Sequence, residues 1–196
     1  MTATDPLASE WDEHLRVASD ASELVPTIRT MADRICGSLA GGGKVLVFGN
    51  GGSAADAQHL AGELLGRFRD TRRPLPAVAL TTDPSVVTCI ANDFSYDDLF
   101  ARQVEALAAP EDVVIGITTS GSSENVVRGL RMARDRGALA IAWTGRDPGA
   151  AGAAAELTLA VPSSTTARIQ EIHTLAMHTI CVAIDAWVAA SDGAPG

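Results

Sequence analysis

The sequence predicts one α/β domain over residues 1–196, in which a doubly wound, five-stranded parallel sheet lies between two layers of helices. The chain has 196 residues, of which 46% are apolar, which suits one sizeable core better than two. Short, continuous apolar runs alternate with segments of helical periodicity, as expected for parallel strands that are buried on both faces. Gly, Asn, Ser and Thr follow two of these runs, where such sheets bind ligands.

Residues 1–40 are expected to form two helices in front of an α/β core at 41–190. The apolar residues of the second helix recur at helical spacing, and three glycines then end the pattern. These apolar residues are Leu24, Ile28, Met31, Ile35 and Leu39. The first helix, around 7–17, carries apolar residues including Trp11 that need a partner surface. We therefore interpret residues 1–40 as an oligomerisation arm.

Five apolar runs are expected to form the strands, at 45–49, 77–81, 113–118, 138–143 and 157–161. Helical segments separate them, which indicates a parallel sheet covered on both faces. The Ala/Gly-rich segment 148–156 is predicted to be a loop or a short helix before the fifth strand.

The charge balance argues against nucleic acid as a partner. Lys and Arg total 15 against 24 for Asp and Glu, which gives a net charge of -9. DNA or RNA would therefore have to bind a local basic patch. One such run, formed by Arg67, Arg69, Arg72 and Arg73, is interpreted as solvated surface, with a phosphate contact from one of these residues as the alternative.

The cysteine and hydropathy patterns predict a soluble, cytoplasmic protein without a membrane partner. Cys36, Cys89 and Cys181 are far apart and form no C-x-x-C pair, so no disulfide framework is indicated. The N-terminal residues lack the basic segment and apolar core of a signal peptide. The most apolar stretch, 172–190, contains two histidines and an aspartate, and falls short of the ~20 apolar residues of a membrane span.

Two loops after the first and third strands are candidate phosphate sites. Gly49 to Ser53 read GNGGS and place flexible backbone N–H groups at a helix N-terminus, where they can bind a phosphate or a sugar. Thr118 to Ser123 read TTSGSS and add hydroxyl donors. Neither loop matches the motifs for ATP or dinucleotides. Either loop alone is equally well explained by ordinary turn and N-cap residues, but together they favour a phosphorylated ligand.

Two helices carry further polar candidates. His59 and Glu63 are four residues apart and share one helix face, where a metal or a substrate can meet both; a solvated pair is the alternative. On the last helix, His173 and His178 face different directions, so at most one of them enters a given site. Gln170 and His178 are separated by ~12 Å of helical rise, so a site that uses both needs long reach or a neighbouring subunit.

The segment SVVTCIANDF provides the remaining candidates. Asn92 and Asp93 follow a predicted short helix and interrupt an apolar stretch, with a helix cap or turn as the alternative role. Cys89 in the same segment is interpreted as a small buried apolar residue.

Four segments in order resemble the sugar isomerase (SIS) domain family and, within it, the phosphoheptose isomerases: GNGGSAADAQHLAGEL, IANDF, GITTSGSSENV and ARIQEIHTLAMH. The resemblance covers nearly the whole chain and implies the SIS-type, flavodoxin-like three-layer fold. It implies a pocket for a sugar phosphate whose residues are Asn50, Gly51, Gly52 and Ser53 on the sugar side, Asn92 and Asp93 as further sugar ligands, and Thr118, Thr119, Ser120 and Ser123 around the phosphate.

The resemblance also implies a catalytic centre. Glu63 and His178 look like the acid/base pair of the family, with Gln170 beside them, and both Glu63 and Gln170 would bind substrate. Some members that resemble this chain bind one zinc ion per subunit, through the positions that match His59, Glu63, Gln170 and His178. The resemblance also implies that the chain forms a homotetramer.

The activity implied by the resemblance is the aldose/ketose isomerisation of sedoheptulose 7-phosphate to D-glycero-D-manno-heptose 7-phosphate through an enediol, the first step towards ADP- or GDP-heptose precursors. A hexose phosphate is the alternative substrate. The alternative outside the enzymes is a non-catalytic SIS-domain protein that binds a sugar phosphate or the bacterial replication initiator. The C-terminal motif of a relative that associates with this initiator resembles SSTTARIQE of this chain. That relative lacks the glutamate and the histidine that this chain has at Glu63 and His178.

Overall fold

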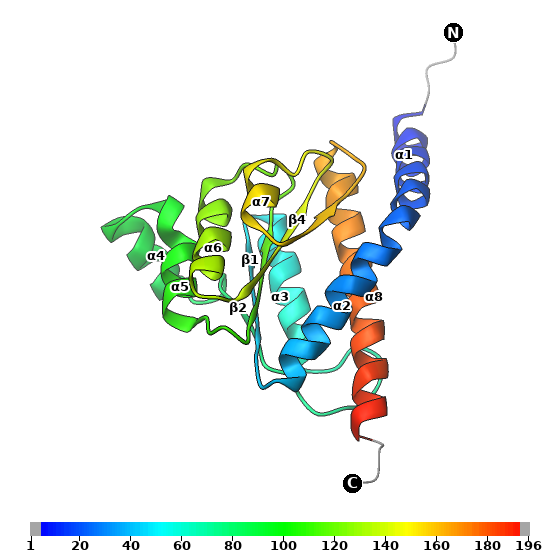
Figure 1. The fold of residues 1–196 in the computed structure, drawn as a ribbon. Helices are drawn as coiled ribbons and strands as arrows, with labels where there is room; N and C mark the ends of the chain where they lie inside the picture. Colours follow the sequence, from blue (N-terminus) through cyan, green and yellow to red (C-terminus); the bar gives the residue numbers. More distant parts are fainter. Residues whose placement is uncertain (1–4, 193–196) are drawn as a thin grey trace.

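Each strand of the sheet is built from one of the apolar runs of the sequence. The computed structural model describes residues 5–192 (Figure 1). The strands are β1 (Val45–Gly49), β2 (Ala77–Ala79), β3 (Val113–Ile117), β4 (Leu139–Thr144) and β5 (Leu157–Ala160). They lie in the order β2-β1-β3-β4-β5, and all neighbours are parallel. This order is the flavodoxin-like arrangement, so the predicted fold class is confirmed.

The second strand is shorter than expected. It ends at Ala79 rather than at residue 81. The Thr82 hydroxyl turns back to donate a hydrogen bond to the Ala79 carbonyl, at 3.1 Å. Asp83 already caps the next helix by accepting hydrogen bonds from the Ser85 and Val86 amides, so the chain has turned away from the sheet.

Two helical layers cover the sheet. The helices are α1 (Pro6–Asp20), α2 (Val25–Ala40), α3 (Gly52–Leu65), α4 (Pro84–Asp93), α5 (Leu99–Leu107), α6 (Glu124–Asp135), α7 (Gly149–Ala154) and α8 (Thr166–Asp192), with short 3-10 turns η1 (Ala21–Leu24) and η2 (Tyr96–Asp98). Strand residues such as Val45 and Val47 pack with α2, α3 and α8. Leu46 and Phe48 point to the other face and pack with α4 to α7, because side chains alternate along a strand (Figure 1).

The longest helix, α8, belongs to the core. Ile172, Ala176, Ile180 and Ile184 recur every four residues and are buried. Among the described residues, α8 is the one helix that is long and apolar enough to cross a membrane by length and composition. However, half of its most apolar stretch is buried inside the fold, as in the core helix of a soluble protein.

The N-terminal helices form as predicted. The Asp5 side chain caps α1 by accepting a hydrogen bond from the Leu7 amide, and Gly41 follows the last residue of α2. While α2 packs along α8, α1 stands apart from the sheet beside the start of α8 (Figure 1). The Ala/Gly-rich segment forms a short helix, α7.

Candidate active site

The two predicted phosphate loops meet at one crevice. The strands that precede them, β1 and β3, are neighbours in the sheet, and the helices that follow, α3 and α6, cover opposite faces. Open α/β sheets bind ligands at this kind of switch point. Gly51 has φ +56°, a conformation that favours glycine, and a Cβ on Gly49 would lie 2.8 Å from the Ile117 carbonyl oxygen. The GNGGS loop therefore depends on its glycines to approach β3 closely.

Hydroxyl groups cluster in the loop after β3. The Thr118 hydroxyl lies 3.0 Å from that of Ser123 and 3.3 Å from that of Ser120. Ser123 precedes α6, but its side chain does not cap the helix. The Ser123 hydroxyl and the first amides of α6 are therefore not hydrogen-bonded to each other. Thr119 is half-buried beside this cluster. Hydroxyls beside a helix N-terminus form a favourable environment for a phosphate.

Asn50 connects the GNGGS loop to helix α6, which follows the TTSGSS loop. Its side-chain amide and that of Asn125 on α6 exchange two hydrogen bonds, each of 2.9 Å. The Tyr96 hydroxyl donates a third bond to Asn50 Oδ1, at 2.9 Å. Asn50, Gly51 and Tyr96 line a cavity of about 130 Å³ that also includes Thr81. Sequence reasoning missed Asn125, although it stands in the segment GITTSGSSENV, and Tyr96, which lies outside the four family-like segments.

Helices α3 and α8 run side by side in the same direction. Gly52 lies against the side-chain amide of Gln170, and a Cβ at that position would overlap it. One turn further, the Thr174 hydroxyl donates to Asp56 at 3.2 Å. The two contacts are four residues apart on each helix, so residues of α3 and α8 at equivalent positions lie opposite each other. The contact faces of α3 and α8 form what we call the seam.

Three predicted residues gather in the middle of the seam. His59 Nε2 and Glu63 Oε1 are 3.0 Å apart, and the His59 and His178 rings meet edge to face at 5.1 Å between centroids. One potential ligand atom from each of His59, Glu63 and His178 lies within 4.8 Å of the others. Phe68 stacks on the His178 ring at 5.3 Å. This arrangement can exchange protons with a ligand or hold a metal ion.

Gln170 lies at the other end of the seam. Its contact partner Gly52 precedes His59 by seven residues, which is ~10 Å of helical rise. Within one copy of the chain the structure therefore brings together His59, Glu63 and His178 and holds Gln170 near the GNGGS loop. This agrees with the expectation that one straight helix does not bring Gln170 and His178 to one small ligand.

His173 is part of the core. It is fully buried, and Nε2 donates a hydrogen bond to the Thr144 carbonyl at 3.1 Å. Burial lowers the pKa of His173 to about 4, although this hydrogen bond opposes the shift. The ring is therefore neutral near pH 7, and only His178 of the two helix histidines enters the site.

Asn92 and Asp93 are the last two residues of α4, rather than residues after it. Both are exposed, and Asn92 donates a hydrogen bond to Asp93 at 2.7 Å. The prediction that Cys89 is buried is wrong, because α4 turns Ile90 inward and Cys89 towards solvent. The hydrogen bond to the Asp93 carboxylate raises the pKa of the Cys89 thiol, so the thiol form is favoured.

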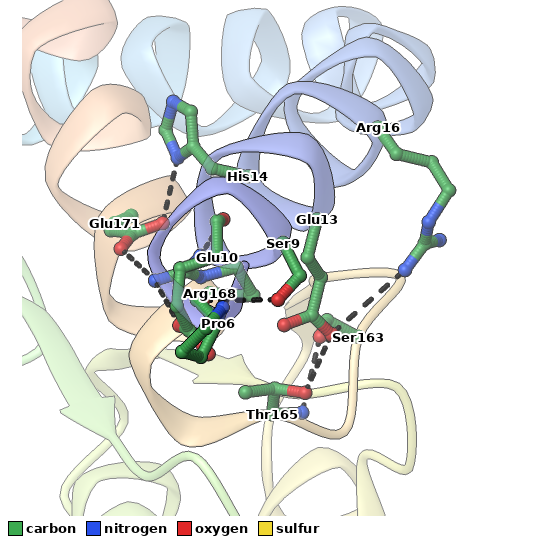
Figure 2. Close-up of polar contacts among 10 residues, drawn as sticks. All are labelled: Pro6, Ser9, Glu10, Glu13, His14, Arg16, Ser163, Thr165, Arg168 and Glu171. Atoms are coloured by element: carbon green, nitrogen blue, oxygen red, sulfur yellow. Dashed lines mark hydrogen bonds and ion pairs between the residues drawn. The ribbon is translucent and has the colours of Figure 1, made fainter. Parts of the chain in front are cut away.

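Polar contacts from α1 hold the first turns of α8, next to Gln170. Arg168 is buried and donates to the Glu10 carbonyl and, at 2.6 Å, to the Glu171 carboxylate (Figure 2). His14 Nδ1 lies 2.7 Å from the second oxygen of Glu171. Helix α1 therefore supports the end of the seam that presents Gln170.

Comparison with known proteins places these features in a family. The sequence profile of the SIS domain matches residues 12–145. A phosphoheptose isomerase of Aquifex aeolicus is 56% identical over 158 residues, which cover 81% of this chain and 83% of that protein. A solved phosphoheptose isomerase from Neisseria gonorrhoeae is 43% identical with a TM-score of 0.87, covering 92% of this chain and 97% of its own. The structure of a phosphoheptose isomerase from Francisella tularensis is 38% identical, with a TM-score of 0.90, and the match covers 95% of this chain and 100% of that chain.

Proposed function

Because the chain belongs to the phosphoheptose isomerases of the SIS-domain family, we propose that it converts sedoheptulose 7-phosphate to D-glycero-D-manno-heptose 7-phosphate. The protein is an aldose–ketose isomerase of carbohydrate metabolism. Its product would enter the synthesis of ADP- or GDP-heptose precursors. The observation that carries the assignment is the acid/base cluster that His59 and Glu63 on helix α3, which starts at the GNGGS loop, form with His178 on helix α8.

We assign the substrate phosphate to the hydroxyl loop and the sugar to the GNGGS side. Phosphate binding by Thr118, Thr119, Ser120 and Ser123 is supported by their clustered hydroxyls at the N-terminus of α6. The sugar would then extend over Asn50, Gly51, Gly52 and Ser53 towards the seam, with Gln170, Asn92 and Asp93 as further ligands.

The isomerisation moves protons without net change in the atoms of the substrate. A base takes a proton from C1 of the ketose while an acid protonates the oxygen on C2, which gives the enediol. Return of a proton to C2 and loss of the proton from the oxygen on C1 complete the aldose. Glu63 and His178 together supply the carboxylate and imidazole for these transfers, and His59 orients the Glu63 carboxylate at 3.0 Å.

The donor set fits zinc. His59, Glu63 and His178 offer two imidazoles and one carboxylate within 4.8 Å of one another, a set typical of catalytic zinc sites that keep an open position. Bound zinc would polarise the substrate carbonyl and stabilise the negative charge of the enediolate. Gln170 is the fourth proposed ligand; because it lies at Gly52, it would have to come from another copy of the chain.

The alternative functions are less well supported. A non-catalytic protein that binds a sugar phosphate or the replication initiator has no need for the His59, Glu63 and His178 cluster. The closely similar curated proteins carry the name phosphoheptose isomerase, which favours a heptose phosphate over a hexose phosphate.

We further propose that the enzyme is a cytoplasmic homotetramer that binds neither nucleic acid nor membranes. Leu7, Trp11 and Leu15 lie four residues apart on α1 and are 74%, 71% and 63% exposed, which leaves an apolar stripe for another subunit. The net charge of -9 disfavours nucleic acid. Light scattering in solution tests the assembly.

The function is tested by following sedoheptulose 7-phosphate by NMR in the presence of the protein. We expect the aldose 7-phosphate to accumulate to equilibrium. A chelator should reduce the rate and added zinc should restore it if the cluster holds a catalytic metal. Absence of conversion by zinc-loaded protein would contradict the isomerase assignment, and full activity with chelator would contradict only the metal.

A further inference from the structure

One arginine of the predicted solvated run is buried. Arg72 follows α3 in the loop towards β2, and its side chain is only 4% exposed. Its partner is Asp185 of α8, at 6% exposed, with Arg72 Nε donating to Asp185 Oδ1 at 2.8 Å. The expectation of a solvated surface is wrong for Arg72, because the loop folds back between α3 and α8. A buried ion pair needs further hydrogen bonds to offset its desolvation.

Arg72 finds those hydrogen bonds at the end of α3. Its Nη2 group donates to the carbonyl of Glu63 at 2.7 Å, and Nη1 donates to the carbonyl of Leu64 at 2.9 Å. The last carbonyls of a helix have no partner within the helix. The Arg72 guanidinium therefore caps the helical turn that carries the Glu63 carboxylate.

Asp185 fixes the same loop from the side of α8. Its Oδ2 accepts hydrogen bonds from the Arg69 amide at 3.1 Å and from the Asp70 amide at 3.4 Å. Burial alone would raise the pKa of Asp185, but Arg72 and these amides outweigh it and hold the pKa below its usual range. Asp185 follows His178 by seven residues, about two turns, so both lie on one face of α8. The loop also carries Phe68, which stacks on His178.

We propose that Arg72 and Asp185 are positioning residues that set the geometry of Glu63 relative to His178. This inference rests on the proposed isomerase function. The pair joins the turn that carries Glu63, the loop that carries Phe68 and the helix that carries His178. A shift of about 1 Å between reacting groups can reduce a rate about 100-fold, so a fixed junction at this place matters for turnover.

The adjacent residue provides a matched control. Arg73 pairs with Asp192 of α8 at 3.3 Å, and the two side chains are 43% and 49% exposed. Arg73 also lies over the Trp187 ring, at 5.4 Å. It thus joins the same loop to the same helix. Its side chain, however, makes no hydrogen bond to a carbonyl of α3 in the described part of the chain.

The test compares Arg72→Met, the double variant Arg72→Met/Asp185→Leu, and the control Arg73→Met. For the first two, we expect kcat for sedoheptulose 7-phosphate to fall about 10- to 100-fold, with KM changed much less, because the lost contact orients the acid/base pair. The double variant removes both buried charges and should therefore lower the melting temperature less than Arg72→Met, which leaves Asp185 buried without its partner. Arg73→Met should match the wild type in both constants.

Chemical rescue separates positioning from general loss of structure. Millimolar methylguanidinium added to Arg72→Ala should restore part of kcat, since it can occupy the same carbonyl and carboxylate contacts, and should leave Arg73→Ala unchanged. A folded double variant with wild-type kcat would overturn the proposed role while the isomerase function stands. A zinc-loaded wild type without turnover would overturn the isomerase function and this inference with it.

Discussion

The two halves of the candidate site are built in different ways. The phosphate half consists of the hydroxyl loop, Thr118 to Ser123, together with the adjoining sugar-side loop, Asn50 to Ser53; both are short stretches at the ends of neighbouring strands. The acid/base half joins His59 and Glu63 on α3 to His178 on α8, more than a hundred residues away. The first half needs only the order of the strands, whereas the second depends on how two helices pack. We therefore expect substitutions in the two halves to affect different kinetic constants.

The largest effect is expected in the acid/base half. Glu63→Gln and His178→Ala should abolish measurable conversion of sedoheptulose 7-phosphate while the proteins remain folded, because each removes a group that transfers protons. Thr179→Ala, which removes an exposed hydroxyl next to His178, is the matched control and should retain activity. The conversion rates of the variants are measured by NMR, and circular dichroism checks that the variants are folded. Near-normal turnover by either site variant would refute the assignment.

The contact that joins α8 to the end of β4 should respond to pH. His173 of α8 binds the Thr144 carbonyl at the end of β4, and burial lowers its pKa to about 4. The unfolded chain takes up this proton near pH 6.5, so the stability contribution is complete above that pH and is lost as the pH falls towards 4. We expect a loss of about 3 kcal/mol over this window.

Urea unfolding of the wild type and of His173→Gln across this window measures that loss. The amide cannot titrate, so the difference between the two proteins should shrink as the pH falls. If the difference in unfolding free energy between the two proteins is the same at pH 6.5 and at pH 4, the His173 ring does not cause the loss of stability.

A smaller effect is expected in the phosphate half. Ser123→Ala removes one hydroxyl from the cluster around Thr118, and a hydrogen bond to a charged group contributes about 1.5–3 kcal/mol. We expect KM to rise by about ten-fold or more while kcat changes little, because the phosphate is distant from the reacting carbons. Steady-state kinetics test this, with Ser191→Ala at the far end of α8 as the control. An unchanged KM would remove Ser123 from the phosphate site.

The sequence predicts the phosphate half better than the acid/base half for a physical reason. Parallel strands end at one edge of the sheet, so GNGGS and TTSGSS could be placed together from the strand pattern alone. His59 and Glu63 could be paired from helical spacing. The addition of His178 depends on the close approach of Gly52 to Gln170, which fixes the register of α3 against α8.

Other contacts had no signal in the sequence. Asn125 and Tyr96 reach Asn50 from separate elements; Tyr96 stands in none of the four family-like segments, and Asn125 stands in GITTSGSSENV without a signal that assigns it a role. Arg72 stands in a run of arginines that is typical of solvated loops, and only the folded chain brings it to the last carbonyls of α3. Tertiary contacts of this kind override local pattern, which is why they were missed or misinterpreted.

The most direct test of the account is isomerisation in D2O by the wild type and by Glu63→Gln, with deuterium at C2 of the aldose measured by NMR. If Glu63 and His178 transfer protons through an enediol, the wild-type product carries solvent deuterium at C2, and Glu63→Gln gives neither product nor exchange. Exchange and conversion by Glu63→Gln at the wild-type rate would contradict the assignment of the acid/base centre to the α3–α8 seam.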